Sequence, residues 1–209
     1  FRSVQHFSDS SSVDNLRVIL GDHDTEYVGE TYSPEVKVFV SKIYVHPKFE
    51  NQIGPQGHDA AILVLKHALN LTRSPSILPI CLSGRKGDIA SGVVAGWSSA
   101  SQGMYFTPIL HHTPVSLIKK SACQEALGLK LPRTSFCGDM DRTAITQCYG
   151  DHGSPYMVRQ GRKYFQTGIL TNAKSCLHPK FHDVYTRVSD LYSFVEDVTM
   201  KENAHACSQ

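Results

Sequence analysis

The sequence lacks the features that would place the chain in a membrane or on nucleic acid. Its longest apolar runs, such as residues 60–65, are far shorter than the roughly 20 residues of a membrane-spanning helix. Lys and Arg (21) nearly balance Asp and Glu (19), and they form no long basic run that would bind nucleic acid. Internal repeats and long low-complexity linkers are also missing. We therefore predict a globular protein with a substantial core, since 41% of its 209 residues are hydrophobic.

The chain also lacks an initial Met and a signal peptide. It begins with Phe1, so we expect a processed or excised part of a longer protein. Six cysteines and the sequon Asn70-Leu71-Thr72 favour an oxidising compartment, secretion and glycosylation at Asn70. Eleven histidines, including the pair His111-His112, show neither the helical spacing nor the Cys-x-x-Cys partner of common zinc sites.

Short strands dominate the local patterns. Residues 16–21 and 36–40 alternate as half-buried strands do, and residues 60–65 and 92–97 resemble buried strands. Only the end of the chain has a helical pattern, with apolar residues at 191, 194, 195 and 198 behind Ser189 and Asp190 as candidate N-caps. The fold class predicted from these patterns is all-β.

One segment carries the functional argument. Residues 148–155 read Cys-Tyr-Gly-Asp-His-Gly-Ser-Pro, which resembles the nucleophile loop Cys-x-Gly-Asp-Ser-Gly-Gly-Pro of chymotrypsin-like serine proteases. The match falls on Cys148, Gly150, Asp151, Gly153 and Pro155, and it places His152 at the nucleophile position. Further segments that resemble that family occur along the chain in the family's order, at residues 18–24, 45–49, 58–65, 78–82, 95–97, 168–170 and 183–189.

The resemblance implies a chymotrypsin-like double six-stranded β-barrel with a C-terminal helix. A single domain would then cover residues 1–209, with the first barrel incomplete in this chain. Residues 1–85 would form the remainder of the first barrel, residues 86–188 the second barrel, and residues 189–200 the helix.

The resemblance also implies two disulfides and leaves the pairing of two further cysteines open. It pairs Cys123 with Cys137 and Cys148 with Cys176. Cys81 occupies the position from which relatives reach an upstream propeptide or regulatory chain, whereas Cys207 lies outside the family pattern. Cys207 could therefore pair with Cys81, with a missing upstream segment, or with another molecule.

The triad positions are incomplete. The resemblance makes Asp59 the triad aspartate, although an aspartate before a buried strand is often only a turn former. For the base, residues 3–7 align with either His6 or Gln5 at the histidine position, or the whole motif precedes Phe1. The start of the chain does not carry the family's activation sequence, so Asp151 needs another donor, such as a protonated His152, or a zymogen-like loop.

The substrate pocket departs from the family pattern as well. Thr146 stands where trypsin-like enzymes carry the aspartate that binds Lys or Arg. The wall Ser-Trp-Gly becomes Thr171-Asn172-Ala173, and a glycine becomes Asp183. Glycine there lets a substrate side chain pass close to the backbone, so Ala173 and Asp183 would narrow the slot.

The predicted function is that of a secreted, catalytically inactive serine protease homologue that binds an extracellular protein. Local similarity is greatest to the branch with haptoglobin and the complement proteases, which implies a plasma or innate-immune setting. One alternative is an active endopeptidase whose nucleophile is misassigned, with Ser154 as the candidate. The other is a ligand or metal carrier, with calcium at Asp22 and Glu35, beside Asp24, Glu26 and Glu30, as against a solvated acidic loop. No other cofactor is predicted.

Overall fold

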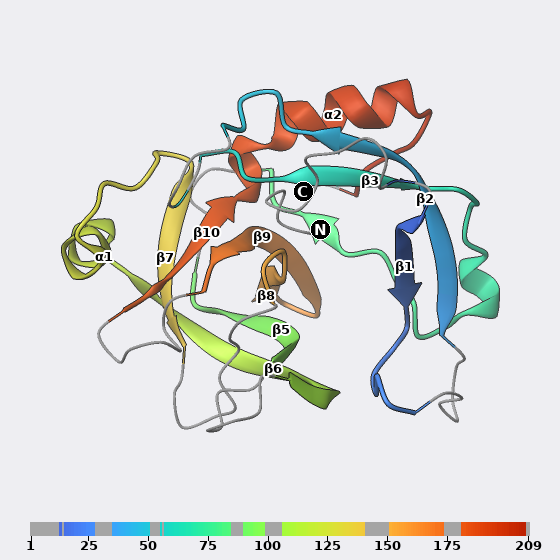
Figure 1. The fold of residues 1–209 in the computed structure, drawn as a ribbon, viewed down its shortest axis with the longest axis horizontal. Helices are drawn as coiled ribbons and strands as arrows, with labels where there is room; N and C mark the ends of the chain where they lie inside the picture. The colour runs from blue at the N-terminus through green and yellow to red at the C-terminus, as the bar shows by residue number, and fades with distance from the viewer. Residues whose placement is uncertain are drawn as a thin grey trace.

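β-strands make up most of the described structure (Figure 1). The computed structural model describes residues 13, 15–27, 35–50, 55, 57–84, 90–98, 106–140, 151–173 and 181–207. In chain order its elements are β1 (Arg17–Leu20), β2 (Val36–Val45), β3 (Ala61–Leu65), the 3-10 helix η3 (Leu71–Arg73), β4 (Cys81–Leu82), β5 (Gly92–Ser98), β6 (Phe106–Ile118), α1 (Lys120–Leu127), β7 (Ser135–Met140), β8 (Pro155–Gln160), β9 (Lys163–Asn172), β10 (Asp183–Arg187), the 3-10 helix η4 (Val188–Asp190) and α2 (Tyr192–Lys201).

Strands β5 to β10 close into a six-stranded antiparallel barrel. They are ordered β10-β7-β6-β5-β8-β9, and the additional pairing of β10 with β9 completes the ring. Its interior is filled by Phe136, Tyr156 and Tyr185, whose ring centroids lie 5.1 to 5.2 Å apart. Gly168 gives these rings room, because a Cβ there would lie 2.6 Å from the ring of Phe136. The prediction of an all-β fold with a closed second barrel is confirmed.

The first β-unit is an antiparallel sheet ordered β1-β2-β3, with three strands in the described part of the chain. Alternate residues of β2 point to opposite faces, as expected for a strand with one face buried. Val38 and Val40 are buried, whereas Phe39 is 45% exposed and lies under the guanidinium of Arg17 on β1.

Main-chain bonds join the two β-units beside the loop after β1. Asp24 forms an isolated antiparallel bridge with Ile109 of β6. The N–H of Thr25 donates to the carbonyl of Pro108 at 2.9 Å, and that of Leu110 donates to the carbonyl of His23 at 2.8 Å. A further link is β4, which lies within residues 1–85 and pairs in parallel with β9 of the barrel.

Helix α2 and the tail behind it connect both β-units, and Figure 1 shows α2 lying across the top of the molecule. Glu202, just after α2, receives bonds from Lys42 Nζ at 2.9 Å and from Tyr44 Oη at 2.5 Å, both on β2. Cys207 forms a disulfide with Cys81 of β4, and its carbonyl accepts the N–H of Leu82 at 2.8 Å. The structure thus settles the open pairing of Cys81 and Cys207 within the chain.

Two predictions about helices are wrong. The C-terminal helix is accompanied by α1, which carries Cys123 and is tied by a disulfide to Cys137 of β7, the pair that the resemblance implies. The residue that caps α2 is Leu191, without a side-chain capping bond, instead of Ser189 or Asp190. Both of those residues belong to η4, so the chain enters α2 from a 3-10 turn. Among the described residues, no helix is long and apolar enough to span a membrane.

Candidate active site and its departures from the family pattern

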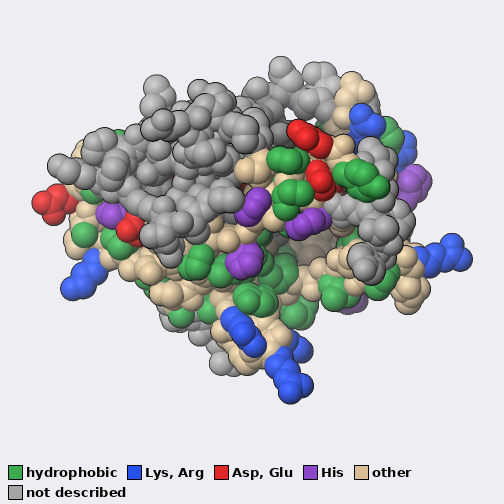
Figure 2. Space-filling model, turned by 90° about the horizontal axis from the view of Figure 1, so that it is seen from below, with side chains coloured by type: hydrophobic (Ala, Val, Ile, Leu, Met, Phe, Trp, Pro, Cys, Tyr) green, Lys and Arg blue, Asp and Glu red, His purple; other side chains and the backbone are tan. Residues whose placement is uncertain are grey.

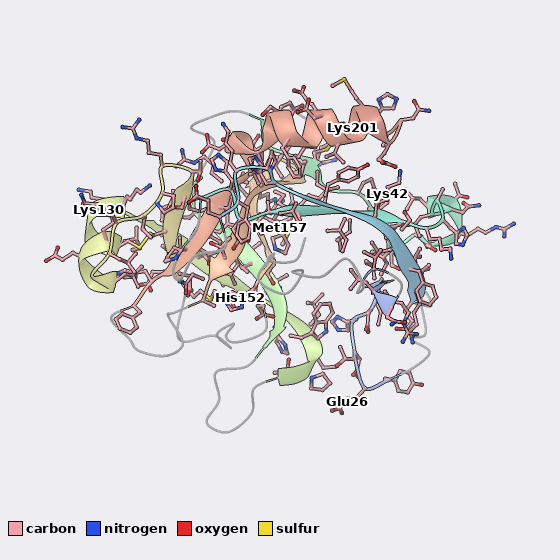
Figure 3. All side chains as sticks on the ribbon, turned by 45° about the horizontal axis from the view of Figure 1, so that its top comes forward. Glu26, Lys42, Lys130, His152, Met157 and Lys201 are labelled. Carbon is pink, nitrogen blue, oxygen red and sulfur yellow. A yellow bond between two sulfur atoms is a disulfide. The ribbon has the colours of Figure 1, made fainter. Side chains whose placement is uncertain are left out.

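A tight turn between Asp151 and Ser154 positions His152. The N–H of Ser154 donates to the carbonyl of Asp151 at 2.9 Å. Gly153 has a φ of 95°, which glycine adopts without strain, and its N–H donates to the carbonyl of Leu170 on β9 at 2.7 Å. The turn is therefore anchored on the barrel through its backbone. In Figure 3, His152 lies among the barrel strands, well away from Glu26 and Lys201.

Asp151 turns inward and is 7% exposed. Its Oδ1 accepts the N–H of Trp97 at 3.2 Å, and its carboxylate lies directly over Gly96. A Cβ on Gly96 would lie 2.4 Å from that oxygen, so only glycine leaves room for the carboxylate. A buried carboxylate needs hydrogen-bond donors, and the N–H of Trp97 is one such donor to Asp151. This role of Gly96 cannot be predicted from residues 95–97 alone, because it depends on a contact with a residue 55 positions away.

Asp59, the predicted triad aspartate, is 1% exposed and stands two residues before β3. Next to it, the carbonyl of Ala60 accepts the N–H of His46, which fixes the start of the strand against the turn after β2. His6 and Gln5, the two candidates for the base position, lie outside the described residues. Of the positions predicted for the triad, the structure describes a buried carboxylate at residue 59 and an imidazole at residue 152.

The predicted pocket wall is closely packed. Thr171 Oγ1 donates to the carbonyl of Val184 at 3.1 Å, and Asn172 pairs with the same residue across the sheet. Ala173 is 4% exposed, and Asp183 has no exposed surface. Side chains thus fill two positions where the resemblance implies glycine. Thr146 and Gly150, together with Cys148 and Cys176, lie outside the described residues.

The charge of Asp183 affects the pKa of a tyrosine in the barrel interior. Burial raises the pKa of the fully buried Tyr185 well above its ordinary value, and the charge of Asp183 raises it further. The carboxylate at position 183 is therefore close enough to the core to influence it electrostatically. A substrate side chain entering this slot would have to compete with a desolvated charge.

Two acidic residues of the predicted calcium region, Asp24 and Glu35, contact other groups in the described structure. Glu35 Oε1 lies 2.6 Å from Lys37 Nζ, and Asp24 Oδ1 accepts the N–H of Glu26 at 3.1 Å. Histidines gather on one face of the molecule (Figure 2). However, no group of three or more His, Cys, Asp or Glu residues among the described ones could hold a metal ion. Glu30 lies outside the described residues.

A groove of about 610 Å³ is lined by residues of α2 and of the tail that follows it. Its walls are Tyr192, Ser193, Glu196, Asp197, Thr199, Met200, Asn203, Ala204, His205 and Ala206. None of these residues belongs to the turn at His152 or to the pocket wall, so this groove is separate from the family's catalytic region.

Comparison with known proteins agrees with the observed fold. A family model described as Trypsin matches residues 3–195. Coagulation factor IX of Cavia porcellus is 25% identical over 179 residues, which cover 83% of this chain and 61% of that protein. The chain thus spans about three fifths of the length of this relative. With most of its length matched, the chain belongs to the trypsin family of chymotrypsin-like serine proteases.

Proposed function

We propose that this trypsin-family domain is a catalytically inactive homologue that acts outside the cell by binding another protein. The observation that carries the proposal is His152 in the turn where the family's serine is expected. Acyl transfer in this family needs a hydroxyl oxygen there, between a histidine base and backbone N–H donors. An imidazole supplies no hydroxyl, and loss of the nucleophile in an unrelated serine protease lowers turnover by about a million-fold.

The pocket supports the same proposal independently. A working slot must admit a substrate side chain, yet Ala173 and Asp183 place side chains at two of its glycine positions. Burial of the Asp183 carboxylate makes the slot unfavourable for an apolar residue. Restoring a protease would therefore require changes at several positions.

Ser154 is the one hydroxyl next to the turn that could be mistaken for the nucleophile. Its N–H donates to Asp151, and its carbonyl accepts the N–H of Leu170 at 2.9 Å. Both bonds place Ser154 at the start of β8, beyond the tip of the turn. This position supports a structural role for Ser154.

A fluorophosphonate probe tests the proposal, because it labels only an activated serine. We expect the chain to remain unlabelled, and to cleave no chromogenic peptide ester, under conditions in which active trypsin is labelled completely. A Ser154→Ala variant run in parallel is the matched control. Labelling of the parent chain that disappears in the variant would show an active protease and overturn the proposal.

Several features support an extracellular setting. Two disulfides join described residues, and a relative is named as a coagulation factor. Asn70, the proposed glycosylation site, is exposed, and Thr72 Oγ1 lies 2.6 Å from its Oδ1. Because Cys81 is bonded to Cys207, an upstream segment linked through Cys81 is no longer part of the proposal. The binding surface is assigned to the loops, which carry function in rigid β-scaffolds.

A further inference from the structure

Two stacked histidines lie where the first sheet meets α2. His46 follows β2 and His58 precedes β3, and their ring centroids are 4.5 Å apart with an interplanar angle of 20°. The ring of Phe194, on α2, meets His46 edge-on at 4.8 Å. His46 is 6% exposed, so the contact between sheet and helix is made through a nearly buried imidazole.

One hydrogen bond requires His46 to be neutral. Its Nδ1 accepts the N–H of Lys48 at 3.1 Å. A neutral imidazole can accept there while it carries its proton on Nε2, but a protonated ring has donors at both nitrogens. Protonation of His46 would therefore place two donors face to face and break this bond.

The charges around the pair disfavour protonation of the closed form. Burial lowers the pKa of His46 to about 4, and the nearby His58 and Lys48 add to the effect. Burial also lowers the pKa of His58, with a contribution from Lys48, whereas Asp190 of η4 acts in the opposite direction. Asp190 lies 3.9 Å from Arg187, so its charge is shared. Phe194 offers no charge to stabilise a second cation.

The other attachments of α2 do not depend on histidine. Lys42 and Tyr44 lie on the same face of β2, and His46, the first residue after the strand, continues their alternation. The first two bind Glu202 beyond the last turn of the helix, and the tail is fixed by the disulfide at Cys207. At the other end of the helix, Leu191 and Val195 stay packed in a buried apolar cluster with residues of both β-units. Loss of the His46 contact would therefore loosen the beginning of α2 and leave its end attached.

We propose that the His46–His58 pair is an acid-sensitive latch, whose protonation in mildly acidic surroundings loosens the contact between the first turns of α2 and the turns that flank β2 and β3. The inference does not depend on whether the domain is an active protease.

The direction of the effect follows from proton linkage. The closed form binds a proton at His46 with a pKa of about 4, whereas an opened ring has its ordinary value of 6.5. Between these values the open form binds more protons, so a falling pH favours opening. Between pH 7.4 and pH 5.0, His46 alone should raise the open population roughly 25-fold.

Hydrogen exchange of the intact chain measures this opening directly. We expect exchange in residues 188–198 and 44–50, corrected for its intrinsic pH dependence, to accelerate at pH 5.0. The barrel strands β5 to β9 serve as the internal reference. The test uses the parent chain, His46→Asn, His58→Asn and the double variant.

Asparagine is the matched replacement at both positions. At residue 46 its Oδ1 can accept the N–H two residues ahead, but it does not titrate. At residue 58 it tolerates the left-handed backbone, since His58 has a φ of 57°. His67→Asn, at an exposed position just after β3, controls for the loss of any histidine.

The double variant should lose the acid acceleration at residues 188–198, and His67→Asn should keep it. The proposal is overturned if the double variant accelerates as much as the parent chain. It is also overturned if acid accelerates the barrel strands equally, because the response would then be global instead of local.

Discussion

At the scale of single residues, the turn from Asp151 to Ser154 has a backbone shape that does not depend on the side chain at its tip. Its shape depends on Gly153 and on main-chain bonds to β9, none of which involves the side chain at position 152. The turn could therefore form with either the serine of the family pattern or His152 at this position. The proposed exchange could be predicted from the sequence because the flanking Asp151 and Gly153 match the family pattern.

Gly96 offers a test of how firmly Asp151 is held. Because a Cβ at residue 96 would lie 2.4 Å from Asp151 Oδ1, Gly96→Ala must displace a buried carboxylate that accepts a bond from Trp97. We expect a loss of about 2 kcal/mol in the free energy of unfolding. Urea denaturation followed by tryptophan fluorescence provides the measurement.

Gly57→Ala is the matched control, because its Cβ would meet Pro132 and Thr134 at an ordinary 3.4 Å. We expect a much smaller change for this variant. Equal losses in the two variants would show that Asp151 moves easily and that its seat on Gly96 is not a constraint.

At the scale of elements, periodicity predicted the strands well but only in part. Alternating side chains identified the core of β1 and β2, and short apolar runs identified that of β3 and β5. The predicted end of β2 at residue 40 was too early. A register shift between Val40 and Lys42 interrupts the alternation, although the strand continues to Val45.

For the two helices, too, the local sequence pattern predicted only part of the structure. The interior of α2 was predicted because Phe194, Val195 and Val198 are buried at helical spacing. Helix α1 was not predicted, because Cys123 is its only buried residue and leaves no apolar stripe. Contacts between distant segments, such as Asp151 with Gly96 or His46 with Phe194, are equally invisible in a local pattern.

The end of α1 gives a prediction about backbone strain. Gly128 caps the helix with a φ of 66°, and a Cβ there would meet no atom within 4 Å. Gly128→Ala should therefore cost only the left-handed conformation, about 1 kcal/mol of unfolding free energy. Chemical denaturation measures it. Gly128→Asn should cost less, since Asn tolerates this conformation, and an equal cost for both would argue against the strain explanation.

At the scale of the whole molecule, one apolar cluster joins parts of both β-units. It combines Ala60, just before β3, with Leu82 of β4, Ile169 of β9, Val188 of η4, and Leu191 and Val195 at α2. Ala206 of the tail packs against it. Neither β-unit buries this surface alone, so we infer that the described parts unfold together.

The disulfide between Cys81 and Cys207 should contribute strongly to that stability, because it closes a loop with a sequence separation of 126. Replacing both residues by serine is expected to lower the unfolding free energy by about 4 kcal/mol, mainly by freeing the unfolded chain. Urea denaturation of the parent and the double variant measures the difference.

The control uses a mild reductant that opens this disulfide but leaves the buried Cys123–Cys137 pair closed, as checked by mass spectrometry. Under that condition the parent and the variant should have equal stability. A variant as stable as the oxidised parent would show that the tail is held by its packing and hydrogen bonds alone.

The same covalent link makes a ring of residues 81 to 207, which contains the entire barrel. Proteolytic nicking at one point inside the ring cannot separate the fragments, because the sulfur bridge still connects them. A nicked molecule would keep its full mass on a gel run without reductant and split only after thiol treatment. Cleavage of the backbone within this ring would thus not by itself release a fragment of the domain; release would also require reduction of the disulfide.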